Sequence, residues 1–347
     1  MTDSAELLRA IAVPRLVGTP NHARVRQTLK RELAARGFEV EEHAFAATPS
    51  RLGSVALAGA CVAWGAIGTV LLLFLSGQPW MVVGWTLTVV VVTTHLLITS
   101  RARTGAGAEA AVHCVNLIAR RPASRPSIWL VAHYDSKGQP ISMATRIVGA
   151  ACLMVGAVAA LGALAVGWMM LPGVALLAVG TSVMARNRVT DASPGAVDNA
   201  SAVVAVFAIL DLLPPGAALG VLFTDAEEWG LLGARALVRE RGALLDGAAV
   251  VNLDGIDDRG RPIAFTHRRG PVGRAVAAEL GAVAAPWLPV LVDGIALARG
   301  SRDCVTIMRG DWQTTRVVHT PLDTAERLTL EGVRQVAAGV ARALASP

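Results

Sequence analysis

The stretch Ser127-Ile-Trp-Leu-Val-Ala-His-Tyr-Asp135 decides the fold of this chain. Its residues 127–132 are almost all apolar and end abruptly at polar residues, which predicts a central strand buried on both faces of a sheet. Because predicted strands alternate with predicted helices, we expect an α/β domain with a mostly parallel mixed sheet flanked by helices. Further strands are predicted at 38–45, 112–119, 219–223 and 248–253, and helices at 5–12, 21–36, 202–213, 231–241, 272–280 and 331–344.

Two long blocks without charged residues interrupt this domain. The chain has 347 residues, of which 53% are hydrophobic and 17% charged, against about 25% charged in a typical soluble domain. Residues 52–98 and 147–185 contain no Asp, Glu, Lys or Arg. A membrane span needs about 20 apolar residues, and a turn signal divides each block. We therefore expect four transmembrane helices, as two inserted hairpins, at 52–75, 80–98, 147–168 and 171–185.

The basic residues near the ends of these spans predict the orientation of the protein. Two hairpins place all remaining segments on one side of the lipid bilayer, and the short turns carry no Lys or Arg. Because cytoplasmic flanks are enriched in Lys and Arg, we expect a multi-pass protein of the cell membrane whose sheet domain lies in the cytoplasm. The flanking basic residues are Arg36, Arg51, Arg101, Arg103, Lys137, Arg146, Arg186 and Arg188.

Composition argues against several other classes of protein. The net charge is +6, but no five consecutive residues are basic and Tyr occurs once, so we expect no nucleic-acid partner. A transporter would need more spans with polar residues inside them. No cysteines are spaced as CxxC, which argues against a thiolate zinc site and a disulfide framework. The sequence predicts no particular oligomeric state.

Carboxylate and imidazole side chains gather where the predicted strands end and helices begin. Taken singly, each has a structural explanation, such as a core histidine, an acidic helix start or an N-cap. Because the carboxyl ends of parallel strands meet at one edge of a sheet, we expect these side chains to converge. Nitrogen and oxygen donors without thiolates suit Zn²⁺, with Mn²⁺ or Co²⁺ also open. The residues are His133, Asp135, Asp198, Glu227, Glu228, Asp254 and His319.

The order of these residues resembles the M28 family of metallopeptidases, the zinc aminopeptidase family that also contains glutaminyl cyclases and some carboxypeptidases. The resemblance covers about residues 110–140 and 190–330 and rests on five motifs in order. The second predicted hairpin falls between the first two motifs, where the family has a short connection. The motifs are His133-Tyr-Asp135, Asp198-Asn199, Glu227-Glu228, Asp254-Gly255 and His319-Thr320.

The resemblance implies a cofactor of two Zn²⁺ ions per chain. His133 and Asp254 would bind one ion, and Glu228 and His319 would bind the other. Asp198 would bridge both ions. The pair of ions would share a water or hydroxide and polarise the scissile carbonyl.

Two further residues take catalytic roles under the same resemblance. Asp135 would accept the second imidazole N–H of His133 and fix its tautomer. Glu227 would be the general base that takes a proton from a zinc-bound water, which leaves a zinc-bound hydroxide to attack the carbonyl, and passes that proton to the leaving amine. The function implied is that of a membrane-anchored dinuclear zinc peptidase, an aminopeptidase that hydrolyses N-terminal bonds of a peptide substrate. Three alternatives stay open: another zinc amide hydrolase, a glutaminyl cyclase-like acyl transferase, and a catalytically silent membrane scaffold with the peptidase fold.

The resemblance and the apolar blocks together divide the chain into five parts. The N-terminal helices and first strand of the catalytic domain occupy 1–51, and the first hairpin occupies 52–98. The segment with the first metal motif is expected at 99–146, the second hairpin at 147–185, and the remaining metal ligands within 186–347.

The sequence departs from the family pattern in three places. Many members use a Tyr to stabilise the oxyanion, whereas the only Tyr here is Tyr134, inside the first metal motif. The family often has an Asp-His pair where this chain has Asp303-Cys304, so Asp303 is expected to be structural. No carboxylate clearly marks a pocket for a substrate amine. The oxyanion group is left open among His267, Arg268, Arg299 and Arg302, and the amine partner among Asp225, Asp257 and Asp258.

Overall fold

The chain divides into two compact units. The first, which we call the sheet domain, comprises Met1–Pro49, Arg103–Gly138 and Thr190–Pro347. The second, the helical insert, comprises Ser50–Ala102 and Gln139–Val189. A computed structural model of the chain describes residues 3–48, 61–62, 64–65, 67–69, 71–72, 78–100, 103–104, 112–122, 125–165, 171–285 and 290–345.

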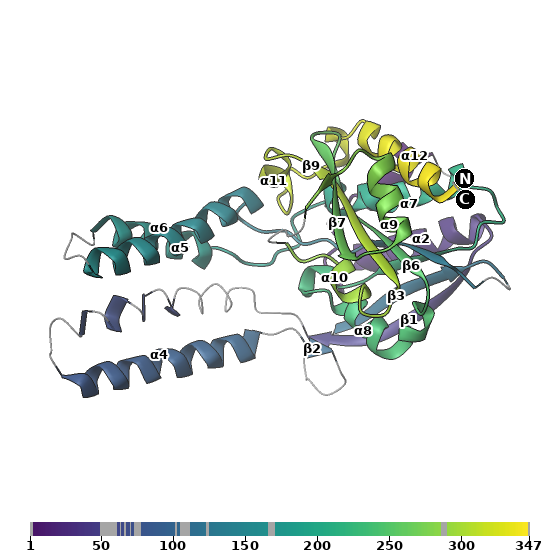
Figure 1. Cartoon of the computed structure of the whole chain (residues 1–347). Helices are drawn as coiled ribbons and strands as arrows, with labels where there is room; N and C mark the ends of the chain where they lie inside the picture. Colours follow the sequence, from purple (N-terminus) through teal and green to yellow (C-terminus); the bar gives the residue numbers. More distant parts are fainter. Residues whose placement is uncertain are drawn as a thin grey trace. The chain divides into compact units, whose positions relative to one another are not determined.

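A nine-stranded mixed sheet forms the centre of the sheet domain (Figure 1), with the strand order β2-β1-β3-β5-β4-β6-β9-β7-β8. The central strands β5, β4, β6 and β9 run parallel to one another, as expected. The outer strands pair mainly antiparallel, so the mostly parallel sheet that the sequence predicts is found only at the centre. The strands are β1 (Glu39–Thr48), β2 (Arg103–Thr104), β3 (Val112–Arg120), β4 (Ile128–His133), β5 (Leu219–Thr224), β6 (Ala249–Ile256), β7 (Arg261–Arg268), β8 (Val283–Ala284) and β9 (Asp303–Gly310).

Helices cover both faces of this sheet, because alternate strand residues point to opposite sides. Leu130 and Ala132 of β4 pack on one face, in a core shared with five helices. Trp129 and Val131 of the same strand pack on the other face, against α8 and α10. The first group of helices is α1 (Ser4–Ile11), α2 (Pro20–Ala35), α7 (Ser201–Leu212), α9 (Pro271–Glu279) and α12 (Glu331–Ala345), and the second is α8 (Leu232–Arg241) and α10 (Gly294–Leu297).

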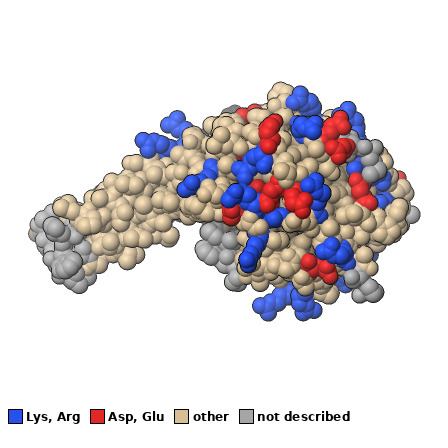
Figure 2. Space-filling view, turned by 90° about the horizontal axis from the view of Figure 1, so that it is seen from above, with Lys and Arg blue, Asp and Glu red and all other residues tan. Residues whose placement is uncertain are grey.

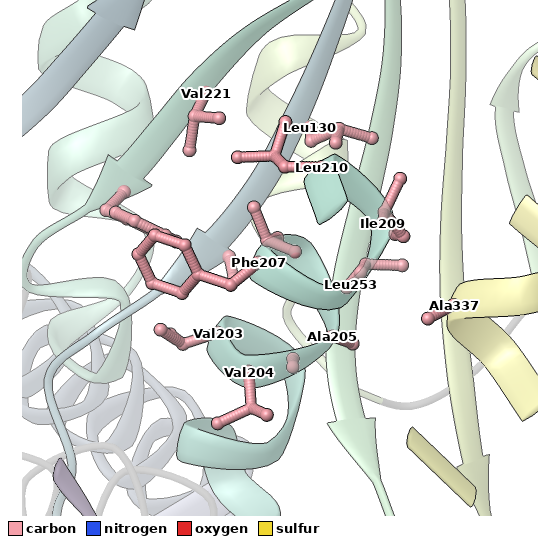
Figure 3. Packing of buried hydrophobic residues seen from close by; sticks show 14 of the residues in the cluster. Leu130, Val203, Val204, Ala205, Phe207, Ile209, Leu210, Val221, Leu253 and Ala337 are labelled. Atoms are coloured by element: carbon pink, nitrogen blue, oxygen red, sulfur yellow. The ribbon is translucent and has the colours of Figure 1, made fainter. Parts of the chain in front are cut away.

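Helix α7 is the most deeply buried of these helices, and its sequence explains why. It is apolar almost all round, and nine of its twelve residues are buried. Figure 3 shows its side chains Phe207 and Ile209 in the core with Leu130 and Leu253 of the strands and Ala337 of α12. A helix without a polar face is stable only when it is covered on several sides. The sheet and α12 therefore fix the position of α7 and of the turn that precedes it.

The sequence did not predict two of the longer strands, β7 and β9. Strand β9 carries Asp303 at its start and Arg309 near its end, so its apolar run is short. Its partner decides its structure, because Leu253 of β6 pairs in parallel with Ile307 of β9. Strand β7 begins at Arg261-Pro262 and pairs antiparallel with β9. In both strands pairing and burial override a weak local signal.

Three long apolar helices belong to the described part of the helical insert. They are α4 (Pro79–Ser100), α5 (Met143–Ala165) and α6 (Leu171–Ala185). Helices α5 and α6 pack closely through glycines: a Cβ atom at Gly173 would lie 2.5 Å from the backbone nitrogen of Ala160. Large side chains instead lie on the outside, where Val158 is 72% exposed. Small residues at a helix contact with large apolar ones outside are typical of helices packed in lipid.

Among the residues that the structure describes, one helix is long and apolar enough to cross a membrane. It contains the window Met143–Ala160, of which 22% is buried. The apolar stretches Val83–Leu96 and Leu171–Ala185 are shorter, and most of the expected span 52–75 lies outside the described residues. The structure thus supports one span by length and composition, where the sequence predicts four. The core helix of a soluble protein passes the same test of length and composition.

Candidate metal centre

The candidate site lies at the edge of the sheet where three parallel strands end. His133 is the last residue of β4, and Asp254 lies near the end of β6. Glu227 and Glu228 open the short 3-10 helix η2 (Glu227–Trp229), which follows β5. The preceding residue, Ala226, has a positive φ of 53°. The turn after β5 is therefore tight, and it places both glutamates next to the end of β4.

Asp198 and His319 enter the site from loops. Asp198 lies in η1 (Ala196–Ala200), one turn before α7, and the peptide bond between it and Asn199 is cis. The Asn199 side chain donates to the carbonyl oxygen of Leu253 over 3.2 Å and accepts from the amide of Gly255 over 3.0 Å. These bonds tie the Asp198 turn to the part of β6 that carries Asp254. His319 follows α11 (Thr314–Val317) and has a positive φ of 65°.

The five ligand candidates form two groups that share Asp198. In the first group, His133 Nε2 lies 3.1 Å from Asp198 Oδ1 and 3.9 Å from Asp254 Oδ1. In the second group, His319 Nε2 lies 3.0 Å from Asp198 Oδ2 and 3.1 Å from Glu228 Oε1. Within each group the ligand atoms all lie within 4.8 Å of one another. Asp198 thus presents one carboxylate oxygen to each group.

The donor atoms of both groups suit a pair of divalent cations. Asp198 Oδ1 and Glu228 Oε1 are buried and accept no hydrogen bond from any described group. A buried carboxylate oxygen without a donor is costly unless a cation or another positive charge compensates it. Imidazole and carboxylate ligands without thiolates match the preferences of zinc. The residues present therefore fit two zinc ions that share Asp198.

Asp135 connects the first group to the glutamate turn. Its carboxylate accepts the backbone amides of Glu227 and Glu228, each over 3.2 Å. His133 Nδ1 lies 3.2 Å from the backbone oxygen of Asp135 and 3.4 Å from its Oδ1. The second nitrogen of the imidazole is thus directed at Asp135, as the resemblance implies, with the backbone oxygen as the nearer acceptor. The same residue also orients the turn that carries Glu227.

The environment of the site shifts the pKa values of its groups. Burial lowers the pKa of His133, but the surrounding carboxylates, Glu227 foremost, outweigh burial and raise it well above its ordinary value. Burial raises the pKa of Glu227 well above the ordinary value, and the negative charges of Glu228 and Asp254 add to the rise. A carboxylate with a raised pKa is a stronger proton acceptor. Glu227 has this property and belongs to neither ligand group.

Sequence reasoning missed three residues that hold the site together. Asp323 is fully buried, and its carboxylate accepts the backbone amides of Val197 over 2.7 Å and of Asp198 over 3.2 Å. Arg15 is 1% exposed and donates to the backbone oxygens of Tyr134 over 2.7 Å and of Gly195 over 3.0 Å. The third residue is Lys137, which contacts Glu228. Asp323 could have been suspected, because it lies in the motif around His319, whereas no local signal marks Arg15.

Several residues that the sequence left open have structural roles. The Asp225 carboxylate is fully buried and is bound by His22 Nε2 at 2.8 Å and by the Tyr134 hydroxyl at 3.0 Å. Asp257 accepts from Arg327 Nη2 over 2.8 Å and Asp258 from the Gly332 amide over 2.8 Å, so all three candidates for a substrate amine are engaged inside the fold.

Two other residues that the sequence analysis singled out are also engaged in structural contacts. Asp303 accepts the Gly273 amide over 3.0 Å, which agrees with the structural role expected of it. Of the oxyanion candidates, His267 is bonded to Thr306 Oγ1 over 2.9 Å.

Comparison with known proteins identifies the family. The sequence model of peptidase family M28 matches residues 116–344. Glutaminyl cyclase of Porphyromonas gingivalis has 16% identity and a TM-score of 0.55, with 98% of this chain and 96% of that chain covered. An aminopeptidase from Aneurinibacillus sp. strain AM-1 has 14% identity and a TM-score of 0.55, with 99% of this chain and 93% of that chain covered. BSAP, a zinc aminopeptidase from Bacillus subtilis, has 13% identity and a TM-score of 0.53, with 98% of this chain and 93% of that chain covered.

These likenesses show a common mixed α/β fold, with a sheet flanked by helices. A search of curated protein sequences found no match. The family assignment therefore rests on the M28 match, which spans more than half of the residues. On that evidence the chain belongs to peptidase family M28.

Proposed function

We propose that the chain is a membrane-anchored zinc peptidase of the aminopeptidase type that binds two zinc ions. The observation that carries this proposal is the pair of ligand groups joined by Asp198, with Glu227 beside His133 of the first group. His133 and Asp254 would hold one ion, Glu228 and His319 the other, and Asp198 would bridge them. All five side chains lie at strand ends or in neighbouring turns and loops. Because the fold holds these segments in place, the site is preorganised.

Hydrolysis of a peptide bond at this site would use Glu227 for proton transfer. When bound, the two ions would polarise the scissile carbonyl and lower the pKa of a water molecule. Glu227 is 6% exposed, and its Oε2 lies 3.8 Å from His133 Nε2. It would take the proton of the attacking water and deliver it to the departing amine. Asp135 would keep Glu227 in place through the backbone amide that it binds, and would keep the His133 ring oriented.

A second activity, cyclisation of an N-terminal glutamine, has support from one observation. Structures similar to this chain include both aminopeptidases and glutaminyl cyclases, with TM-scores of 0.55 for members of each kind. Both reactions attack an amide carbonyl, with water in one and the substrate's own amine in the other. We favour hydrolysis because both complete ligand groups are present, and two ions can bind and activate a water between them.

The helical insert would anchor this enzyme in the lipid bilayer. Its described helices carry exposed apolar side chains, among them Trp80 at 80% and Val158 at 72% exposure. Two hairpins, at 52–98 and 147–185, would leave the sheet domain on the cytoplasmic side, where the flanking arginines belong. Membrane fractions should retain the protein after extraction with alkaline carbonate. A reporter fused to the C-terminus should be active in the cytoplasm, and activity on the opposite side would overturn this topology.

The enzymatic proposal is tested by metal content and substrate choice together. Purified protein should contain close to two zinc ions per chain, and chelation should abolish activity. A panel of aminoacyl-nitroanilides, dipeptides and peptides with N-terminal Gln separates the two activities. Release of free amino acids supports the aminopeptidase, whereas loss of ammonia from N-terminal Gln supports the cyclase. A reproducible zinc content near zero would contradict both the aminopeptidase and the cyclase activity, and would favour a catalytically silent scaffold.

A further inference from the structure

Lys137 lies directly beside one of the metal-ligand candidates. Its Nζ is 2.5 Å from Glu228 Oε2, and the two side chains are 11% and 3% exposed. The chain contains only two lysines, and Lys30 is the other. This ammonium group is partly buried and contacts the carboxylate of a ligand candidate, unlike a surface cation that flanks a membrane span.

The backbone around Lys137 is held on both sides, so the position of the lysine is set by the fold. On one side, the Ser136 amide donates to the backbone oxygen of Arg15 over 3.3 Å, and the Ser136 hydroxyl donates to Ser193. On the other side, Gly138 and Thr190 exchange backbone hydrogen bonds of 2.7 and 2.9 Å. A Cβ atom at Gly138 would lie 2.6 Å from Thr190 Oγ1, so this close approach requires glycine.

Lys137 divides the two oxygens of the Glu228 carboxylate between different partners. Oε2 contacts the ammonium group, and Oε1 lies 3.1 Å from His319 Nε2. Only Oε1 therefore faces the atoms with which a metal ion would be shared. The lysine also adds a positive charge next to the second group, where it opposes the binding of a divalent cation.

The first group has the opposite electrostatic surroundings. His133 Nε2 lies 3.8 Å from the Glu227 carboxylate, and His133 Nδ1 lies 3.4 Å from that of Asp135. Neither of these carboxylates is a ligand candidate, so their negative charge adds to that of the ligands Asp198 and Asp254. The two groups thus differ in charge although they share Asp198.

We propose that Lys137 makes the two metal sites unequal. It restricts Glu228 to a single ligand oxygen and weakens the affinity of the second group, so this group loads last and releases its ion first. This inference rests on the proposed function, because it needs two zinc sites. Lys137 is a positioning residue under this proposal, since it acts on the metal through Glu228.

The test is a zinc titration of the metal-stripped full-length protein against a chromophoric chelator. The unmodified chain should show two classes of site that differ in affinity. Lys137→Met should tighten the weaker class by about tenfold or more, because one opposing charge is removed at short range. The stronger class should stay unchanged. Lys137→Gln is measured in parallel, so that the result does not depend on the folding of one variant.

Two controls separate the charge of Lys137 from other effects. Lys137→Arg retains the positive charge and should keep two unequal classes. Lys30→Met removes the other lysine, which is paired with Glu42 at 2.9 Å on the surface, and should change neither class. A gain in affinity is informative because structural damage at a metal site lowers affinity.

The possible failures can be told apart. If the unmodified chain binds two zinc ions and the neutral Lys137 variants leave the weaker class unchanged or looser, this inference is wrong and the peptidase proposal stands. If the unmodified chain binds two ions with equal affinity, the inference is also wrong. If it binds no zinc, the proposed function and the inference fail together.

Discussion

The sheet domain and the helical insert distribute polar and apolar groups in opposite ways. In the sheet domain, charged side chains such as Asp135, Asp225 and Asp323 are fully buried and hydrogen-bonded. In the helical insert, glycines line the contact between α5 and α6, while valines face outward. Figure 2 draws the described part of the helical insert mainly in tan, whereas basic and acidic side chains mix over the face of the sheet domain that it presents. The first distribution is typical of a domain surrounded by water, and the second fits the membrane anchor that we propose for the insert.

The largest effect is expected at Glu227, the buried acid that the proposal uses for proton transfer. Glu227→Gln should lower the peptidase kcat by about 10²–10⁴-fold and leave zinc content unchanged, because neither ligand group contains this residue. Steady-state kinetics and metal analysis check both parts. The matched control, Glu279→Gln, alters an exposed glutamate paired with Arg342 and should keep full activity. If the Glu227→Gln variant cleaves peptides at the normal rate, Glu227 is not the general base.

A smaller effect is expected at Asp323, which supports a ligand without being one. Asp323→Ala removes the acceptor of the Val197 and Asp198 amides, so the bridging carboxylate is held less firmly. Zinc affinity should fall by about 10–100-fold, as measured by competition with a chelator. The control Asp246→Ala changes an exposed aspartate and should bind zinc normally. Equal affinities in the two variants would show that the Asp198 turn needs no support from Asp323.

The contact between α5 and α6 provides the corresponding test in the helical insert. Gly173→Leu should destabilise this helix pair by about 1–3 kcal/mol, because any Cβ atom there meets the backbone of Ala160. Unfolding of the detergent-solubilised protein measures the loss. Gly162→Leu is the matched control, since a Cβ atom at Gly162 meets nothing within 4 Å. An equal loss in both variants would mean that the glycines of this face do not set the contact. Zinc content should be normal in either variant.

The smallest effect concerns Asp258, which caps α12 in the sheet domain. Its carboxylate accepts the amides of Thr329 over 2.5 Å and Gly332 over 2.8 Å. Burial raises the pKa of Asp258, but these hydrogen bonds outweigh burial and lower it below its ordinary value. Asp258→Ala should lower the free energy of unfolding by about 1 kcal/mol at neutral pH.

The pH dependence of that loss has a defined sign. A carboxyl group with a lowered pKa in the folded state stabilises the protein above its ordinary pKa, and this contribution is lost as the pH falls through the folded value. The difference between the Asp258→Ala variant and the unmodified chain should therefore shrink in acid. Denaturant unfolding at a series of pH values checks this. A difference that stays constant would assign the effect to packing rather than to the charged cap.

Local sequence predicted the regular elements with strong patterns and missed those with weak ones. Strands β4 and β5 and helices α7 and α12 lie within one residue of the expected ranges, and β6 continues three residues beyond its expected end, because long apolar or amphipathic runs define these elements. Strand β9 escaped prediction because Asp303 and Arg309 flank a short apolar run, and only its pairing with β6 makes it a central strand. The outer strands β1 and β3 were predicted as strands, but their antiparallel direction was not, since strand direction depends on neighbours that the local sequence does not specify.

For the candidate site, the sequence by itself predicted which imidazoles and carboxylates gather at one edge of the sheet, because these side chains stand in a fixed order at the ends of predicted strands. The tertiary structure decided the distances at which they meet, since it places Asp198 3.1 Å from His133 and 3.0 Å from His319. It also gave Asp225 a buried structural role and placed Lys137, which the sequence suggested only as a flank of a membrane span, against Glu228. These outcomes depend on contacts between residues far apart along the chain, such as His22 and Asp225, which are 203 positions apart. Such distances are set by the packing of α7 on the sheet and by the hydrogen bonds of buried loops, and no local pattern encodes them.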